Sequence, residues 1–164
     1  MYYGTLLGVV WGLMYLSFFA FLSNLSMTMA FIYIALFFCS PFIAGKFATR
    51  YRDNCLEGIM TYGQAWRFIF YIYIFASLTS TVFNIVYFEF IENGTIFAAL
   101  ETYMNEMEKL PGIQETFIGQ YRELLDSFKQ NNVWMFLEND LTNSIILPTI
   151  IALFVRKTDI KPTE

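Results

Sequence analysis

The sequence has little charge and no histidine. Only 15% of its 164 residues are Asp, Glu, Lys or Arg, and the first 45 residues contain none of the four. A soluble domain of this length needs more charge to cover its surface, so the composition excludes an ordinary soluble globular fold. Catalysis by a histidine base and metal binding by histidine clusters are excluded because the residue is absent.

Cysteine and basic residues are also scarce. Two cysteines, Cys39 and Cys55, are too few for a disulfide framework or a zinc site. The net charge of −4 and the lack of a basic stripe argue against a nucleic-acid partner. The sequence also lacks a nucleophile–base pair and a glycine-rich phosphate loop. We therefore expect no enzymatic activity, no cofactor and no metal site.

Long apolar runs dominate what is present. A transmembrane helix needs roughly 20 mostly apolar residues to cross about 30 Å of hydrocarbon. Four segments meet this requirement, at about residues 4–23, 28–45, 66–91 and 133–155. The sequence therefore predicts an all-α integral membrane protein in which residues 1–164 form a single membrane domain with four transmembrane helices.

The basic residues predict the orientation of these helices. Seven of the ten lie between the second and third spans or after the fourth, and the other three lie in the loop between spans three and four. Positive charge is retained on the cytoplasmic side of membrane proteins. Both termini are thus predicted to be cytoplasmic, with the following residues as anchors: Lys46, Arg50, Arg52, Arg67, Arg156 and Lys157.

The loop between spans three and four has its own helical pattern. Apolar residues recur at helical spacing over about 94–110 and again over about 113–130, with Pro111-Gly112 between them and Asn131-Asn132 after them. This pattern predicts an extracytoplasmic hairpin of two amphipathic helices with acidic polar faces. Its apolar faces either pack on each other and cap the bundle, or dock on a partner protein.

Two local patterns concern helix ends and helix contacts. Thr61 and Gln64 have the spacing of a capping box, which predicts that the third helix begins near Tyr62. Gly4, Gly8 and Gly12 repeat every four residues, so they lie on one helix face that another backbone can approach closely. This glycine face packs either within the chain or against another subunit.

Polar residues also fall inside the predicted spans. Counting inward from the basic anchors at 1.5 Å per residue places Asn84, Asp140 and Asn143 at about the same depth, in the outer third of the membrane. An ionisable group within the membrane is a functional-site hypothesis. The alternative is structural: Asn84 and Asn143 bond across helices, and Asp140 reaches interfacial water.

The middle of the chain resembles a known family. Residues 51–54 read YRDN, residues 58–66 read GIMTYGQAW, and the third span ends in VYFEFI at residues 86–91. This order and spacing resembles the bacterial membrane proteins grouped as domain of unknown function 4199. That family has Ser where this chain has Thr61, and Phe where it has Trp66. The resemblance implies a four-helix protein of a bacterial inner membrane, and it implies no activity or catalytic residues.

Two functional hypotheses follow. The first is an accessory or scaffolding subunit of a larger membrane complex, because the chain combines a glycine face and an acidic helical hairpin with no catalytic group. The alternative is a small homo-oligomeric channel or transporter, in which Asn84, Asp140 and Asn143 line the path. The expected partners are the lipid bilayer and either another membrane protein or further copies of this chain.

Overall fold

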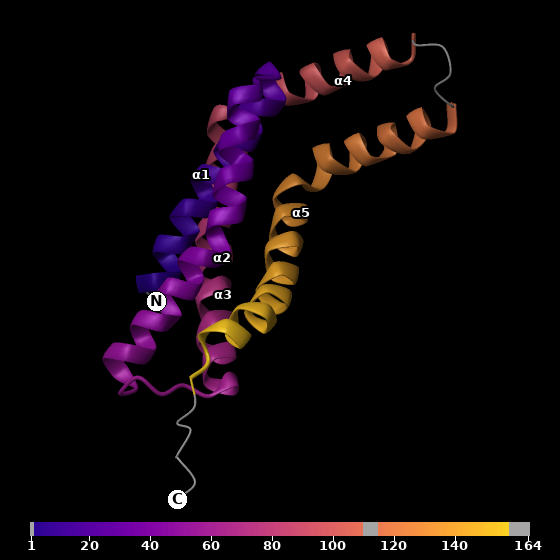
Figure 1. The fold of residues 1–164 in the computed structure, drawn as a ribbon. Coiled ribbons are helices and arrows are strands. Elements are labelled where there is room, and N and C mark those ends of the chain that lie inside the picture. Colours follow the sequence, from indigo (N-terminus) through magenta and orange to yellow (C-terminus); the bar gives the residue numbers. More distant parts are fainter. Residues whose placement is uncertain (1, 110–114, 158–164) are drawn as a thin grey trace, which may run out of the picture.

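The computed structural model describes residues 2–109 and 115–157, and within them the chain is all-helical. Figure 1 shows three long helices running side by side, with a fourth long helix bent away from them at one end. The elements are, in chain order, α1 (Tyr2–Asn24), α2 (Met27–Cys55), α3 (Tyr62–Val86), η1 (Tyr87–Ile91), α4 (Thr95–Met107) and α5 (Glu115–Val155). The predicted break at Pro111-Gly112 lies outside the described residues.

Among the described residues, three helices are long and apolar enough to cross a membrane: Tyr2–Asn24, Met27–Cys55 and Tyr62–Ile91. They match the first three predicted spans. The fourth predicted span, 133–155, lies within α5, which is long enough but is not among these three helices. The reason is compositional, because this part of the helix carries Glu138, Asn139 and Asp140 before its apolar run begins.

The third long helix ends in a wider turn. After Val86 the chain continues as the π-helix η1, in which the Glu92 N–H donates to the Tyr87 carbonyl oxygen five residues earlier (2.8 Å). Gly94 then takes a left-handed conformation, with φ of 84°, and α4 begins at Thr95. Glycine adopts this conformation without steric cost, so it suits the sharp change of direction between α3 and α4.

α4 and the first part of α5 lie side by side at one end of the molecule (Figure 1). Two ion pairs join them: Arg122 with Glu108, at 2.5 Å between Nη2 and Oε1, and Lys129 with Glu101. The predicted break at Asn131-Asn132 is confirmed at Asn131, whose backbone is non-helical (φ −130°, ψ 28°). α5 therefore consists of two helical parts, one before and one after this residue, that meet at a kink.

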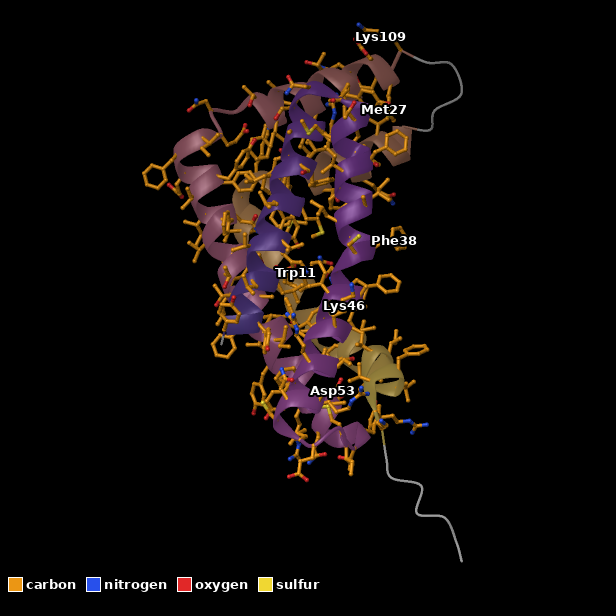
Figure 2. All side chains as sticks on the ribbon, turned by 60° about the vertical axis from the view of Figure 1, so that its left-hand side comes forward. Trp11, Met27, Phe38, Lys46, Asp53 and Lys109 are labelled. Atoms are coloured by element: carbon orange, nitrogen blue, oxygen red, sulfur yellow. The ribbon has the colours of Figure 1, made fainter. Side chains whose placement is uncertain are left out.

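The opposite end holds the connection between α2 and α3. There, Thr61 and Gln64 form the predicted capping box, with the Thr61 N–H donating to Gln64 Oε1 at 2.9 Å. Met60 and Lys157 pair through two backbone hydrogen bonds, of 2.8 and 2.9 Å. The end of α5 therefore lies beside the α2–α3 connection. Figure 2 shows Asp53 toward this end and Lys109, which follows α4, at the opposite end.

The predicted glycine face packs against α3 of the same chain. A Cβ added at Gly4 would lie 2.5 Å from Phe75 Cβ, and one added at Gly12 would lie 2.6 Å from Phe83 Cγ. One added at Gly8 would overlap Thr79 Cβ. Since these distances are far below a normal contact, the glycines let α1 and α3 approach closely. The face is thus used for a contact inside the monomer, between α1 and α3.

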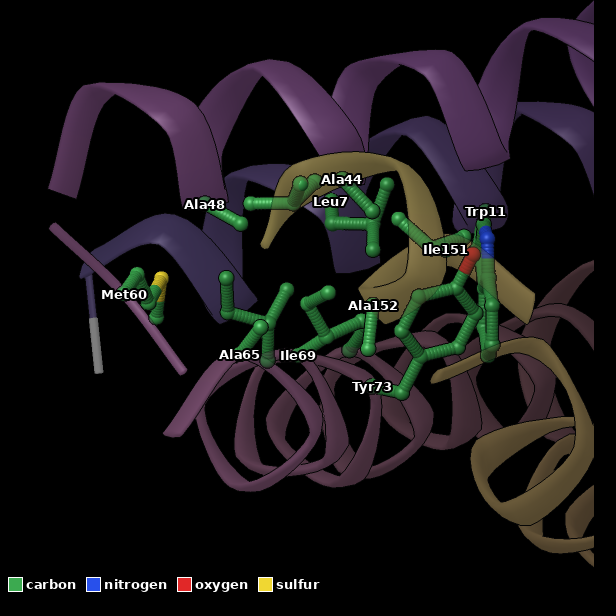
Figure 3. Packing of buried hydrophobic residues seen from close by; sticks show 13 residues of the cluster. Leu7, Trp11, Ala44, Ala48, Met60, Ala65, Ile69, Tyr73, Ile151 and Ala152 are labelled. Carbon is green, nitrogen blue, oxygen red and sulfur yellow. The ribbon is translucent and has the colours of Figure 1, made fainter. Parts of the chain in front are cut away.

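Small residues continue this close packing into the core. α2, α3 and α5 contribute buried alanines, and Leu7 and Trp11 of α1 pack among them. Figure 3 shows Trp11 and Tyr73 beside each other at one edge of this cluster, with ring centroids 5.3 Å apart. A second cluster, rich in aromatic rings and centred on Phe19, lies toward α4. α3 therefore sits between α1 and α5 and fixes the position of both.

Candidate functional site

Asp140 is buried inside the helix bundle, with only 1% of its surface exposed. Its carboxylate accepts two hydrogen bonds from hydroxyl groups on other helices. The Tyr15 hydroxyl, on α1, donates to Oδ1, and the Ser80 hydroxyl, on α3, donates to Oδ2 at 2.6 Å. We call Asp140, Tyr15 and Ser80 the carboxylate cluster. It joins three helices that are distant in sequence.

Local sequence explains why these three groups meet. Ser77, Ser80 and Asn84 are spaced three and four residues apart, so they share one buried face of α3. Tyr15 lies one turn beyond the glycine face of α1, whose close approach to α3 also brings Tyr15 near Ser80. On α5, the Ser144 hydroxyl donates to the Asp140 carbonyl oxygen at 2.7 Å.

The predicted polar residues are only partly brought together. Asp140 and Asn143 line one cavity, whereas Asn84 does not line it. Asn84 is 1% exposed, and neither its side-chain nitrogen nor its side-chain oxygen has a hydrogen-bond partner among the described residues. The expected bond between Asn84 and Asn143 is therefore absent there, so this part of the structural alternative is wrong. Asp140 is 1% exposed and lines the cavity described next.

The cavity beside Asp140 has a volume of about 210 Å³ and lies between α1, α2 and α5. We call it the inner cavity. Its polar lining is Ser40, Asn139, Asp140 and Asn143, and its aromatic lining is Trp11, Tyr15, Tyr33, Phe37 and Phe38. Phe37 and Phe38 are 45% and 63% exposed, respectively, so the inner cavity reaches the molecular surface beside α2.

A larger cavity, of about 530 Å³, lies between α1, α2, α4 and α5. We call it the outer cavity. Aromatic and methionine side chains make up most of its wall: Tyr15, Phe18, Tyr33, Tyr103, Met104, Met107, Tyr121, Phe128, Met135 and Phe136. Tyr15, Tyr33 and Asn139 line both cavities, so the two adjoin at these residues. A volume of this size and an apolar wall are typical of sites for small organic ligands.

The charged side chains that form salt bridges lie away from Asp140. The salt bridges among the described residues lie at the ends of the molecule, and none of them includes Asp140. The predicted anchors Lys46, Arg50, Arg67, Arg156 and Lys157 are exposed, and Arg52 donates to the Val155 carbonyl oxygen at 2.9 Å. Within the described part of the chain, no three acidic or cysteine side chains gather in a way that would hold a metal ion.

Sequence reasoning missed Tyr15 and Ser80. A tyrosine and a serine in apolar helices carry no charge, and aromatic residues are frequent in this chain, which is 20% Phe, Trp and Tyr. One signal was present in retrospect: Tyr15 lies three residues after Gly12, on the side of α1 that the glycines bring against α3. The cavities were also missed, because they form between elements far apart in sequence.

Comparison with known proteins gives a family but no activity. The family model described as "Protein of unknown function (DUF4199)" matches residues 2–157. The match covers most of the chain, so the protein belongs to this family, as the sequence motifs indicated. The comparisons with curated proteins and with solved structures gave no match.

Proposed function

We propose that this member of the DUF4199 family is a four-span membrane protein that binds a membrane-soluble organic molecule in the adjoining inner and outer cavities. The observation that carries the proposal is the outer cavity, about 530 Å³ of mostly apolar and aromatic space between the bundle and the α4–α5 hairpin. It is the kind of site that holds a lipophilic ligand. The resemblance of the sequence motifs supports a bacterial inner membrane.

The proposed fourth span is the part of α5 after Asn131. At 1.5 Å per residue, the 24 residues from Asn132 to Val155 measure about 36 Å, which is enough to cross the hydrocarbon core. The pairing of Lys157 with Met60 supports this arrangement, because it requires the end of α5 to lie on the same side as the α2–α3 connection. By the distribution of basic residues, that side is cytoplasmic.

Cysteine labelling tests the topology. In a Cys39→Ser background, Cys55 reports the α2–α3 end, and the variants Arg156→Cys and Lys109→Cys report the end of α5 and the hairpin; all of these positions are exposed. We expect a membrane-impermeant maleimide to label Lys109→Cys in intact cells, and to label Cys55 and Arg156→Cys only after permeabilisation. Labelling of Arg156→Cys in intact cells would refute the fourth span.

Photolabelling tests the binding. A neutral probe, 4-(hydroxymethyl)benzophenone, is added to proteoliposomes and irradiated, and the modified methionines are mapped by mass spectrometry. Met104 and Met135 line the outer cavity, whereas Met27 is 71% exposed and lines neither cavity, so Met27 measures labelling from bulk lipid. Binding in the cavity should raise labelling of Met104 and Met135 relative to Met27.

A cavity-filling variant provides the control. Leu100 lines the outer cavity, and Leu100→Trp adds volume there, whereas Leu78→Trp adds the same volume on the exposed surface of α3. We expect the first variant to reduce labelling of Met104 relative to Met27 and the second to leave the ratio unchanged. Equal ratios in both variants and the original protein would refute the proposed function.

An accessory-subunit role is the second candidate function, and the acidic surface of the α4–α5 hairpin is the feature that supports it. The glycine face that suggested a partner is used within the monomer, but the outer surface of the hairpin is acidic, with Glu106, Glu123 and Asp126 all exposed. Such a surface suits a basic partner. Gentle extraction with an affinity tag tests this role: a stoichiometric second polypeptide supports it, provided that reversing the charges of these three residues releases that polypeptide.

We favour binding over conduction because the proposed channel residues are not all on one path. Asp140 and Asn143 line the inner cavity, but Asn84 does not. A channel would require wild-type ion flux in proteoliposomes that Asp140→Asn abolishes. Without such flux, the channel hypothesis fails while the binding hypothesis stands.

A further inference from the structure

We infer that the ligand is a lipophilic organic cation, whose positive charge is recognised by Asp140 and whose apolar body occupies the aromatic-lined cavities. This inference rests on the proposed function, because it names the chemical class of the molecule bound there. Two features of the inner cavity carry it: a carboxylate that has no cationic partner among the described residues, and a wall of aromatic rings.

The first feature is the unbalanced charge of Asp140. Buried carboxylates in proteins are normally paired with a basic group, because transfer of a charge from water to an apolar environment is costly. Here the partners are the neutral hydroxyls of Tyr15 and Ser80, and no ion pair within the described residues includes this carboxylate. A bound cation would provide the positive charge that the described part of the chain does not place there.

The second feature is the aromatic wall. The inner cavity is lined by the rings of five residues: Trp11, Tyr15, Tyr33, Phe37 and Phe38. The face of an aromatic ring attracts cations, and quaternary ammonium groups are recognised by groups of such rings. A neutral or anionic ligand would gain only apolar contact from this wall, so the combination with Asp140 favours a cation.

The geometry also gives the cation a place to bind and a way in. Phe37 and Phe38 border the inner cavity and are exposed, so a molecule dissolved in the bilayer can enter beside α2. Tyr15 and Asn139 then lie between the two cavities, with Asn139 Nδ2 3.5 Å from the Tyr15 hydroxyl oxygen. A charged group in the inner cavity is next to the carboxylate cluster, and an apolar body can extend into the outer cavity.

Three photoprobes with one benzophenone body test the inference: 4-(trimethylammoniomethyl)benzophenone, the neutral hydroxymethyl compound and the 4-carboxylate. Each is added to phosphatidylcholine proteoliposomes, and labelling of Met14, which lines the inner cavity, is divided by labelling of Met27. The test variant is Asp140→Asn. The matched control is Glu138→Gln, which removes an exposed carboxylate two residues away on the same helix.

We expect Asp140→Asn to lower the Met14/Met27 ratio for the cationic probe by about tenfold, the scale of one lost charge-assisted contact. The ratio for the neutral probe should not change, and that constancy also shows that the variant is folded. Glu138→Gln should match the original protein for all three probes, and Asp140→Glu should retain the preference for the cation.

A competition measurement on the protein without substitutions tests the same inference and does not depend on the folding of any variant. Tetraphenylphosphonium should reduce labelling of Met14 by the neutral probe, whereas tetraphenylborate, of the same shape and opposite charge, should not. Equal competition by the two ions, or a cation ratio unaffected by Asp140→Asn, overturns the inference while the proposed function stands. If the neutral probe fails to label Met104 above Met27, the proposed function itself fails.

Discussion

The packing of α1 on α3 predicts that Gly8 is intolerant of even one added methyl group. A Cβ at this position would overlap Thr79 Cβ and lie 2.9 Å from the Ala76 carbonyl oxygen. Carbon atoms pack best at about 3.5–4.0 Å, so α1 must move away by about 1 Å and lose contacts along the seam. Overpacking of this kind typically costs about 1–3 kcal/mol.

Gly45→Ala is the matched control. Its added Cβ would lie 3.6 Å from Ile151 Cγ2, which is an ordinary contact. Replacing glycine by alanine within a helix gains about 1 kcal/mol through helix propensity, and this gain is common to both variants, so it cancels in the difference. We therefore expect Gly8→Ala to be less stable than Gly45→Ala by about 1–3 kcal/mol.

The assay is unfolding by sodium dodecyl sulfate in mixed micelles, followed by tryptophan fluorescence, since Trp11 is buried one turn from Gly8. The oligomeric state, measured by native mass spectrometry, should be the same for both variants because the seam is internal. If Gly8→Ala is as stable as Gly45→Ala, the close α1–α3 contact described above is refuted.

Three further predictions concern hydrogen bonds and ion pairs, each measured by the same unfolding assay. Tyr15→Phe leaves one buried Asp140 oxygen without its hydroxyl donor, so it should lower the free energy of unfolding by about 1–3 kcal/mol. Tyr71→Phe, at a side chain that is 61% exposed, should lower it by less than about 0.5 kcal/mol. Equal effects of the two variants would contradict the buried bond. Thr61→Ala removes the cap of α3 and should lower the free energy of unfolding by about 0.5–2 kcal/mol. Thr61→Ser keeps a capping hydroxyl and should retain most of that stability. A Ser variant that is no more stable than the Ala variant would argue against the cap. Lys129→Ala should cost no more than about 1 kcal/mol, because its pair with Glu101 is largely exposed; a greater loss that persists in high salt would contradict this assignment.

The positions of the helices were predictable from the sequence because a membrane imposes a simple rule. A segment that crosses hydrocarbon must satisfy its backbone groups internally, so long apolar runs become helices. The capping box at Thr61 was predictable for a similar reason, since its hydrogen bonds are local and depend on a spacing of three residues. The glycine spacing likewise identified a close helix contact, although not which helix would make it.

The carboxylate cluster was not predictable, because it depends on how each helix is rotated about its axis. That rotation is set by packing against neighbouring helices, which one sequence does not reveal. Depth alone suggested that Asn84 would meet Asn143, but depth says nothing about which side of its own helix each residue faces, Asn84 on α3 and Asn143 on α5. The break at Asn131 was predictable from the polar pair Asn131-Asn132, but the sequence did not show the direction in which the helix resumes.

The burial of Asp140 has a consequence for how the chain is inserted and assembled. In the four-span arrangement, Asp140 lies in the outer third of the membrane, and its cost on entering the bilayer alone is at most about 2.5–3.5 kcal/mol, the cost of an aspartate at the centre of a helix. Its hydroxyl donors, Tyr15 and Ser80, belong to α1 and α3, which are synthesised before α5. The least apolar helix comes last, so α1 and α3 are in place to receive it. The backbone pairing of Lys157 with Met60 holds the end of α5 beside the α2–α3 connection.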